Sequence, residues 1–288
     1  MSRSGALRLA VAQPPARAGE PEETRLADAL AAIAGAGGAG AELLLFPESY
    51  PGPIRAGSAM ECSAEIGAAA AEAGVAVCWG RVERGDDGVH RTVAYLVGPD
   101  GAVLLRYERA HPATGDVHPV LSGAAMAPGA RLGFARLGDI GVGLLICSEL
   151  WIPEIARTLA VRGADVLLAP AGGSFRRVAP NWRLLARARA VENQLHLGLT
   201  QALYGDEEGS ALIAGPEAVV ASSTGPGLVV GDCDLERARW LREHDDSMRE
   251  PKQFDSLPGL LRARRPELYG DLTRPAADLY DYDGAARR

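Results

Sequence analysis

The sequence of 288 residues predicts a single α/β domain in which helices cover sheets. Short apolar runs alternate with longer amphipathic segments along most of the chain. Three strand-like runs in the middle follow one another across turn-rich connections, which is typical of antiparallel hairpins. No linker divides residues 1–288 and no repeat is visible, so we expect one domain.

Hydrophobic spacing and turn residues define the expected elements. Apolar runs of about four to eight residues bounded by Gly, Pro or Asp indicate strands, and apolar residues three to four positions apart indicate helices. Strands are expected at 7–13, 75–82, 91–98, 102–110, 132–138, 140–147, 165–171, 195–201, 210–216, 218–223 and 227–235, and residues 41–49 are expected to form a strand followed by a Pro turn. Helices are expected at 22–38, 64–74, 153–164, 180–194 and 235–246. We expect a long functional loop at 112–130 and an extended tail at 245–288.

Composition and charge exclude several classes of function. The net charge of −7 gives no electrostatic support for nucleic-acid binding. The apolar runs are far shorter than the ~20 residues needed to cross a bilayer, and residues 1–23 contain no signal-like apolar stretch. The cysteines show neither CxxC spacing nor neighbouring histidine pairs, so no metal site or disulfide framework is expected. We therefore expect a soluble cytoplasmic protein with reduced thiols, and we place Cys78 and Cys233 in the core.

Side chains that could carry chemistry follow three of the expected strands. Glu48 follows one strand, Arg109 and His111 end another, and Cys147 ends a third. Reactive groups often lie where strands of a rigid sheet run out into loops. A cysteine needs a nearby base or positive charge to act as a nucleophile, and an acid and a cation on neighbouring strand ends could supply both.

Each of these residues also has a structural interpretation. Cys147 could be a small core residue that ends a strand, because cysteine is often buried as an apolar group. Glu48 could be a solvated loop acid, and Arg109 could pair at the surface with Glu108 or Asp116. Residue spacing alone leaves these alternatives open.

Four motifs resemble those of the nitrilase superfamily of carbon–nitrogen hydrolases, in order and at similar spacing. They are FPES (46–49), GPDGAVLLRYERAHP (98–112), ICSELWIPEIARTLAVRGADVLLAPA (146–171) and ARAVENQ (188–194). The resemblance extends over nearly the whole chain. It implies a four-layer αββα sandwich that acts on a small-molecule substrate without a metal or cofactor. It also implies a homodimer or higher homo-oligomer, with residues 245–288 as a candidate for dimer contacts.

The resemblance implies roles for individual residues. Glu48 matches the acid of the family's Glu–Lys–Cys triad and Cys147 matches its nucleophile, while Arg109 stands where the family has lysine. Many members carry a second glutamate in the loop that follows, and this sequence has none there. Ser122 falls near that position, and Asp116 is the only acid of the loop.

These matches imply cysteine-dependent hydrolysis of a non-peptide C–N bond, in a small amide or carbamoyl compound, through a thioester acyl-enzyme. Glu48 would take the thiol proton, and Arg109 with the Ser148 backbone N–H would stabilise the oxyanion. Glu149 and Trp151 follow the nucleophile directly and are expected to shape the substrate pocket. The alternatives are a catalytically silent paralogue with the same fold, an acyl- or amine-transferring enzyme, and a nitrile hydrolase.

Overall fold

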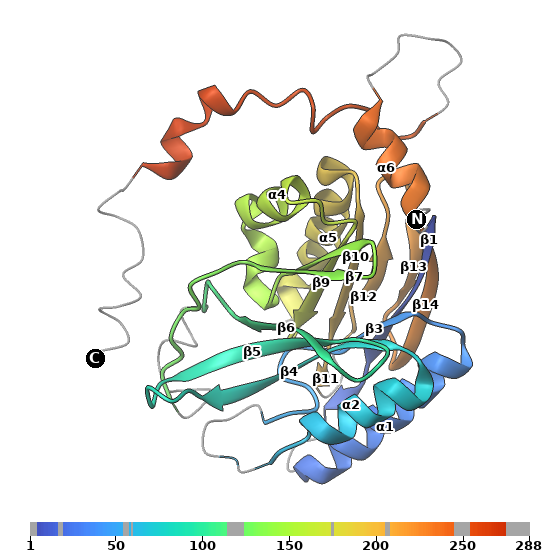
Figure 1. Cartoon of the computed structure of the whole chain (residues 1–288), viewed down its shortest axis with the longest axis vertical. Helices are drawn as coiled ribbons and strands as arrows, with labels where there is room; N and C mark the ends of the chain where they lie inside the picture. The colour runs from blue at the N-terminus through green and yellow to red at the C-terminus, as the bar shows by residue number, and fades with distance from the viewer. Residues whose placement is uncertain are drawn as a thin grey trace.

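The computed structural model contains two six-stranded sheets with helices on their outer faces (Figure 1). It describes residues 5–16, 20–53, 58, 60–113, 124–173, 176–204, 208–244 and 254–274. The helices are α1 (Glu22–Gly38), α2 (Ser63–Ala73), α4 (Pro153–Val161), α5 (Ala179–Asn193) and α6 (Leu235–Glu243). Short 3₁₀ helices span Cys147–Trp151, Arg176–Val178, Pro266–Leu268 and Gly270–Thr273. No helix in these ranges is long and apolar enough to cross a bilayer.

The two sheets share a design, with parallel strands in the middle and antiparallel strands at the edges. The first has the order β14 (Gly227–Asp234), β1 (Ala6–Gln13), β3 (Leu43–Leu45), β4 (Ala76–Arg84), β5 (His90–Val97) and β6 (Val103–Glu108). The second has the order β13 (Val219–Ser223), β12 (Ala211–Ala214), β10 (His196–Gln201), β9 (Val166–Ala171), β8 (Ile140–Leu144) and β7 (Gly133–Leu137). A two-stranded parallel sheet joins β2 (Pro15–Ala16) to β11 (Leu203–Tyr204). Parallel pairing at the centre of each sheet places the carboxyl ends of β3 and β4, and those of β8, β9 and β10, along the same end of their sheet. The loops that follow these strand ends are where functional side chains are commonly found.

Alternation along the strands builds three apolar layers. Leu43 and Leu45 of β3 face the second sheet, whereas Leu44 between them packs under α1 and α2. On β9, Leu168 faces the first sheet and Leu167 packs under α4 and α5. Since successive side chains of a strand point to opposite faces, fully apolar strands of this kind need cover on both sides. The sheets therefore pack face to face with helices outside, the arrangement that the sequence predicts.

The sequence predicts most elements, with differences at their ends. Helix α1 spans the predicted residues, and the predicted hairpins of β4, β5, β6 and of β7, β8 are present. The strand predicted within 41–49, before the Pro turn, covers only Leu43–Leu45, and the strand predicted at 140–147 ends at Leu144. In the second case the backbone N–H of Ile146 donates to the side chain of Glu149, so a 3₁₀ turn replaces the sheet ladder. Strands β2 and β11 were not predicted.

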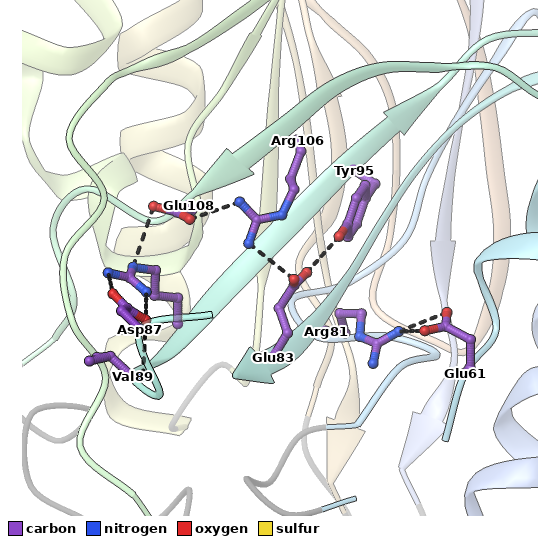
Figure 2. Close-up of polar contacts among 9 residues, drawn as sticks. Glu61, Arg81, Glu83, Asp87, Val89, Tyr95, Arg106 and Glu108 are labelled. Atoms are coloured by element: carbon purple, nitrogen blue, oxygen red, sulfur yellow. Dashed lines mark hydrogen bonds and ion pairs between the residues drawn. The ribbon is translucent and has the colours of Figure 1, made fainter. Parts of the chain in front are cut away.

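Charged side chains cross the antiparallel part of the first sheet on its outer face, the face against which α1 and α2 pack (Figure 2). Arg106 of β6 donates to Glu83 of β4 at 3.0 Å and to Glu108 at 2.7 Å, and the Tyr95 hydroxyl of β5 donates to Glu83 at 2.6 Å. Each exposed pair of this kind contributes roughly 0–1 kcal/mol. Together they hold β6 in register immediately before Arg109.

The C-terminal part of the described chain leaves the sandwich after α6 (Figure 1). The carbonyl of Leu257 accepts a hydrogen bond from the Gln194 side chain, and Gly259 N–H donates to the carbonyl of Leu241. Beyond these anchors, residues 266–274 are exposed, including Leu268 and Leu272. The anchors fix where the tail departs from the domain.

Candidate active site

Glu48, Arg109 and Cys147 follow three different strands, and the fold brings them into contact. Arg109 Nη1 donates to Glu48 Oε1 at 2.9 Å. The Cys147 thiol is hydrogen-bonded to the carboxylate of Glu48. Glu48 therefore contacts the cation on one side and the thiol on the other, which is the relationship a base between a nucleophile and a stabilising charge requires.

A turn after β3 positions Glu48. Its backbone N–H donates to the carbonyl of Ala171 at the end of β9 at 3.2 Å, so the turn of one sheet is tied to a strand of the other. The side chain is 15% exposed. An ideal Cβ on Gly172 would lie 2.8 Å from Glu48 Oε2, closer than real contacts of this kind allow. Glycine at 172 thus gives the carboxylate its space.

Arg109 is a buried residue, only 2% exposed, and it lies directly after β6. The interpretation of Arg109 as a surface residue paired with Glu108 is wrong, because Glu108 pairs with Arg106 and Arg91 instead. The other surface partner considered, Asp116, lies outside the described residues. A buried guanidinium needs a compensating carboxylate, and removing one partner of a buried pair typically costs about 3–5 kcal/mol.

Cys147 begins the 3₁₀ turn with a positive φ of 54°, a left-handed conformation uncommon for residues other than glycine. Such strain costs about 1–3 kcal/mol and is frequent at functional sites. The pKa of the thiol is raised to about 12, by burial first and by the negative charge of Glu48 second, although Arg109 and the Gly172 N–H act in the opposite direction. The thiol is therefore protonated at rest, and nucleophilic attack requires a base.

Ser148 contacts Arg109 through its side chain. Arg109 Nη2 donates to Ser148 Oγ at 2.6 Å, so the two terminal nitrogens of the guanidinium hold Glu48 and Ser148 respectively. Sequence reasoning considered only the backbone N–H of Ser148. No spacing pattern signals a hydroxyl contact that depends on a tight turn, so this interaction was missed.

Glu149 is fully buried and ties two strand ends together. Its carboxylate accepts hydrogen bonds from the Tyr107 hydroxyl at 2.7 Å and from the N–H groups of Ala110 at 2.9 Å, His111 at 3.0 Å and Ile146 at 2.7 Å. The loop that carries Arg109 and the turn that carries the nucleophile thus share one carboxylate. Glu149 was expected to shape the substrate pocket, and from this interior position it acts through those two backbone segments.

Trp151 ends the 3₁₀ turn and is 38% exposed. Its ring meets Trp182 of α5 edge-on, with centroids 5.5 Å apart. Arg189 of α5 donates to the carbonyls of Leu150 at 3.1 Å and Trp151 at 3.3 Å. Helix α5 therefore holds the end of the turn that begins at Cys147, and part of the Trp151 side chain remains exposed.

Ser122 and Asp116, the candidates for the position of the second glutamate, lie outside the described residues. Within the ranges that the structure describes, no group of three or more His, Cys, Asp or Glu side chains is arranged to hold a metal ion. Cys78 and Cys233 are fully buried in the layer between the sheets, as predicted. Among the described cysteines, Cys147 alone is partly exposed.

The chain is similar in sequence to known amidases. The chain is 29% identical to deaminated glutathione amidase from Homo sapiens over 208 residues, which cover 67% of this chain and 60% of that protein. This match thus spans less than two thirds of that amidase. Identity to omega-amidase NIT2 from Homo sapiens is 24% over 231 residues, covering 74% of this chain and 84% of that protein.

The fold is shared with an amidase from Nesterenkonia sp., with a TM-score of 0.71 and 24% identity over 93% of this chain and 97% of that one. One form of that amidase carries the acetamide moiety of fluoroacetamide, added covalently at its active site cysteine, and another form holds butyramide. The sequence profile of the carbon–nitrogen hydrolases matches residues 8–243, which span both sheets and every candidate site residue. The expected resemblance is confirmed, and the chain belongs to the carbon–nitrogen hydrolase family.

Proposed function

We propose that the protein hydrolyses the C–N bond of a small amide or carbamoyl compound, with Cys147 as nucleophile, Glu48 as base and Arg109 as the stabilising cation. The observation that carries this proposal is the position of Glu48, which contacts the Arg109 guanidinium and the Cys147 thiol at once. The amidase activities named for the relatives and the cysteine adduct of the Nesterenkonia amidase support it.

In the first step the Glu48 carboxylate accepts the thiol proton while the sulfur of Cys147 attacks the substrate carbonyl carbon. The C=O π bond becomes an oxyanion in a tetrahedral intermediate. Arg109 and the backbone N–H of Ser148 stabilise this charge, and removing one such donor typically costs about 3–4 kcal/mol of transition-state stabilisation. Coupling proton removal to attack avoids a free thiolate, which suits a thiol with a pKa of about 12.

In the second step the intermediate collapses and the C–N bond breaks. Glu48 returns its proton to the departing nitrogen, which leaves as ammonia or an amine, and the acyl group remains as a thioester on Cys147. Glu48 then removes a proton from water as the water attacks the thioester. Collapse of this second intermediate releases the acid and returns the proton to the Cys147 sulfur.

Arginine at position 109 restricts how protons can move. A guanidinium has a pKa above about 12 and stays protonated throughout turnover, so it supplies charge and hydrogen bonds without shuttling protons. Every proton transfer near the sulfur then passes through Glu48. The contacts of Glu48 with both the thiol and the guanidinium support this role.

A panel of small amides, carbamoyl compounds and nitriles tests the proposal. The wild type is expected to release ammonia or amine from amides or carbamoyl compounds, and fluoroacetamide is expected to add an acetamide moiety at Cys147. The Cys147→Ala variant is expected to lose both, whereas Cys62→Ser, at the start of α2, is expected to keep both. Unchanged turnover in Cys147→Ala would overturn the proposal. Adduct formation without turnover on any compound would favour the silent paralogue.

We also infer a homo-oligomer. Exposed apolar side chains include Leu184 of α5, which is 63% exposed, and Leu268 and Leu272 of the tail, which are 60% and 66% exposed. Light scattering is expected to give a mass of at least twice 30.1 kDa. The Leu184→Asp variant is expected to lower that mass, and a monomeric wild type would contradict the inference.

A further inference from the structure

We propose that the hydroxyl of Ser148 is a positioning residue that fixes the guanidinium of Arg109, so that this site is built for arginine rather than lysine. The inference rests on the proposed function of Arg109 as the stabilising cation. It starts from one contact: Arg109 Nη2 donates to Ser148 Oγ at 2.6 Å. Hydrogen bonds from charged nitrogen donors commonly measure about 2.7–2.9 Å, so this is a close contact.

The arginine is held at both ends. Its backbone N–H donates to the carbonyl of Thr92 at 2.9 Å, and its carbonyl accepts from the Gly129 N–H at 2.8 Å. At the other end of the side chain, Nη1 contacts Glu48 and Nη2 contacts Ser148. Since the guanidinium is a rigid planar fork, two anchors on its two arms set both its position and the orientation of its plane.

The second anchor, Ser148, lies in the same backbone turn as the nucleophile. Ser148 follows Cys147 in the same 3₁₀ turn, and that turn is closed by hydrogen bonds between Ile146 and Glu149. The positions of the sulfur and of Ser148 Oγ are therefore set by one short backbone segment. The contact from Arg109 to Ser148 keeps the cation aligned with the turn that presents the thiol.

A lysine at position 109 would use this anchor differently. Its ammonium group is a compact charge with freely rotating donors on a flexible stem, and it has no planar fork to orient. One nitrogen beside Glu48 would satisfy the main ion pair. The Ser148 hydroxyl is therefore expected to matter when residue 109 is arginine and to matter little when it is lysine.

A double-mutant cycle tests this dependence, with wild type, Ser148→Ala, Arg109→Lys and the double variant assayed on one amide. Ser148→Ala is expected to lower kcat by about 10- to 100-fold with a small change in KM, the size associated with losing a hydrogen bond to a charged group. In the Arg109→Lys background the same change is expected to cost less than about threefold, because the fork is absent. Ser148→Thr, which retains the hydroxyl, is expected to keep most of the wild-type rate.

The control is Ser63→Ala, since the Ser63 hydroxyl also bonds a charged group, Glu61 at 2.6 Å, but at the start of α2. It is expected to leave kcat unchanged. An equal loss from Ser148→Ala in both backgrounds would overturn the proposal, because the hydroxyl would then act independently of the arginine. Failure of Ser148→Thr to retain activity, with Ser148→Ala impaired, would also overturn it.

The rate of Cys147 alkylation by iodoacetamide, measured against pH, separates this inference from the proposed function. The charge of Arg109 lowers the pKa of the Cys147 thiol. In Ser148→Ala the guanidinium loses one of its two anchors, so the alkylation rate is expected to rise at a higher pH than in the wild type. This readout needs no turnover. A protein inactive on every amide would refute the proposed function, while the shift would still support the Ser148 contact and an unshifted profile would refute it.

Discussion

Arg109 donates from Nη1 to Oε1 of Glu48 across 2.9 Å, and these residues follow strands β6 and β3 of the same sheet. Only 2% of Arg109 is exposed, so water screens this ion pair weakly. The same carboxylate is hydrogen-bonded to the Cys147 thiol.

Replacing Glu48 by glutamine is expected to change turnover and thiol reactivity in opposite directions. Loss of a general base lowers kcat by about 100- to 10,000-fold. After burial, the charge of Glu48 is the next cause that raises the pKa of the Cys147 thiol, so Glu48→Gln is expected to shift alkylation by iodoacetamide to lower pH. Measurement of kcat for amide hydrolysis checks the first effect, and alkylation rates measured over a series of pH values check the second. Parallel loss of turnover and alkylation at every pH would contradict the prediction.

Gly172→Ala is expected to impair catalysis while leaving the fold intact. The added Cβ would lie 2.8 Å from Glu48 Oε2, and the carboxylate must move away from its place beside the thiol. We expect kcat to fall about tenfold or more, since small displacements of catalytic groups are costly. Gly38→Ala is the matched control, because no atom lies within 4 Å of the position of its new Cβ. Equal activity of the two variants would show that the close approach is harmless.

Glu149→Gln is expected to destabilise the protein and lower its activity together. An amide would point an NH₂ group at backbone N–H donors that the carboxylate now accepts. Leaving such buried donors unsatisfied costs about 1–3 kcal/mol, which for a chain of this size lowers Tm by several degrees. Glu65→Gln, in the first turn of α2, serves as the control in thermal unfolding. A Tm equal to that of the wild type would show that Glu149 does not hold the two strand ends.

Asp165 is expected to make stability depend on acid pH. It accepts hydrogen bonds from Arg239 at 2.9 Å, from Arg242 at 2.7 Å and from the Gly141 N–H at 3.0 Å. Burial alone would raise the pKa of Asp165, but the Arg239 hydrogen bond, the Gly141 N–H and the two arginine charges lower it from 3.8 to about 2. A depressed carboxyl pKa stabilises the folded state above the unfolded value, and that contribution is lost as pH falls from about 4 towards 2.

Urea unfolding at pH 7, 4 and 3 measures this effect. The free energy of unfolding is expected to drop by about 1–2 kcal/mol over that acid window because of this group. Asp165→Asn is expected to be less stable at pH 7 and to lack this part of the drop. The same acid dependence in Asp165→Asn and wild type would assign the effect to other carboxylates.

The sequence predicted the elements with strong periodicity. Helix α1 has the predicted bounds because Leu26, Leu30 and Ile33 recur at helical spacing and acidic residues occupy its first turn. The strand before Glu48 was predicted too long, since its apolar run continues past the point where the ladder ends. Strands β2 and β11 pair residues such as Pro15 and Leu203, which lie far apart in the chain, and such short pairings leave no periodic signal.

The site was predicted in part. Glu48, Arg109 and Cys147 were singled out by their places after strands and by the family motifs. The burial of Arg109 could not be predicted, because the neighbouring residues are also charged and no local pattern distinguishes the buried arginine from the exposed ones. The side-chain role of Ser148 depends on the 3₁₀ turn that begins with a left-handed residue, and cysteine has no preference for that conformation. Contacts such as Asp165 to Arg239 join positions 74 apart in the chain, so they emerge only from the folded topology.

The strand ends that form the site belong to different sheets: Glu48 and Arg109 extend from the first, and Cys147 extends from the second. A chain in which only one sheet has formed holds either the acid and the cation or the cysteine, but never the set. The candidate site is therefore complete only when the two sheets have docked and closed the layer between them. An incompletely folded molecule would be chemically harmless towards amides in its surroundings, and recovery of activity during refolding would time the docking of the sheets.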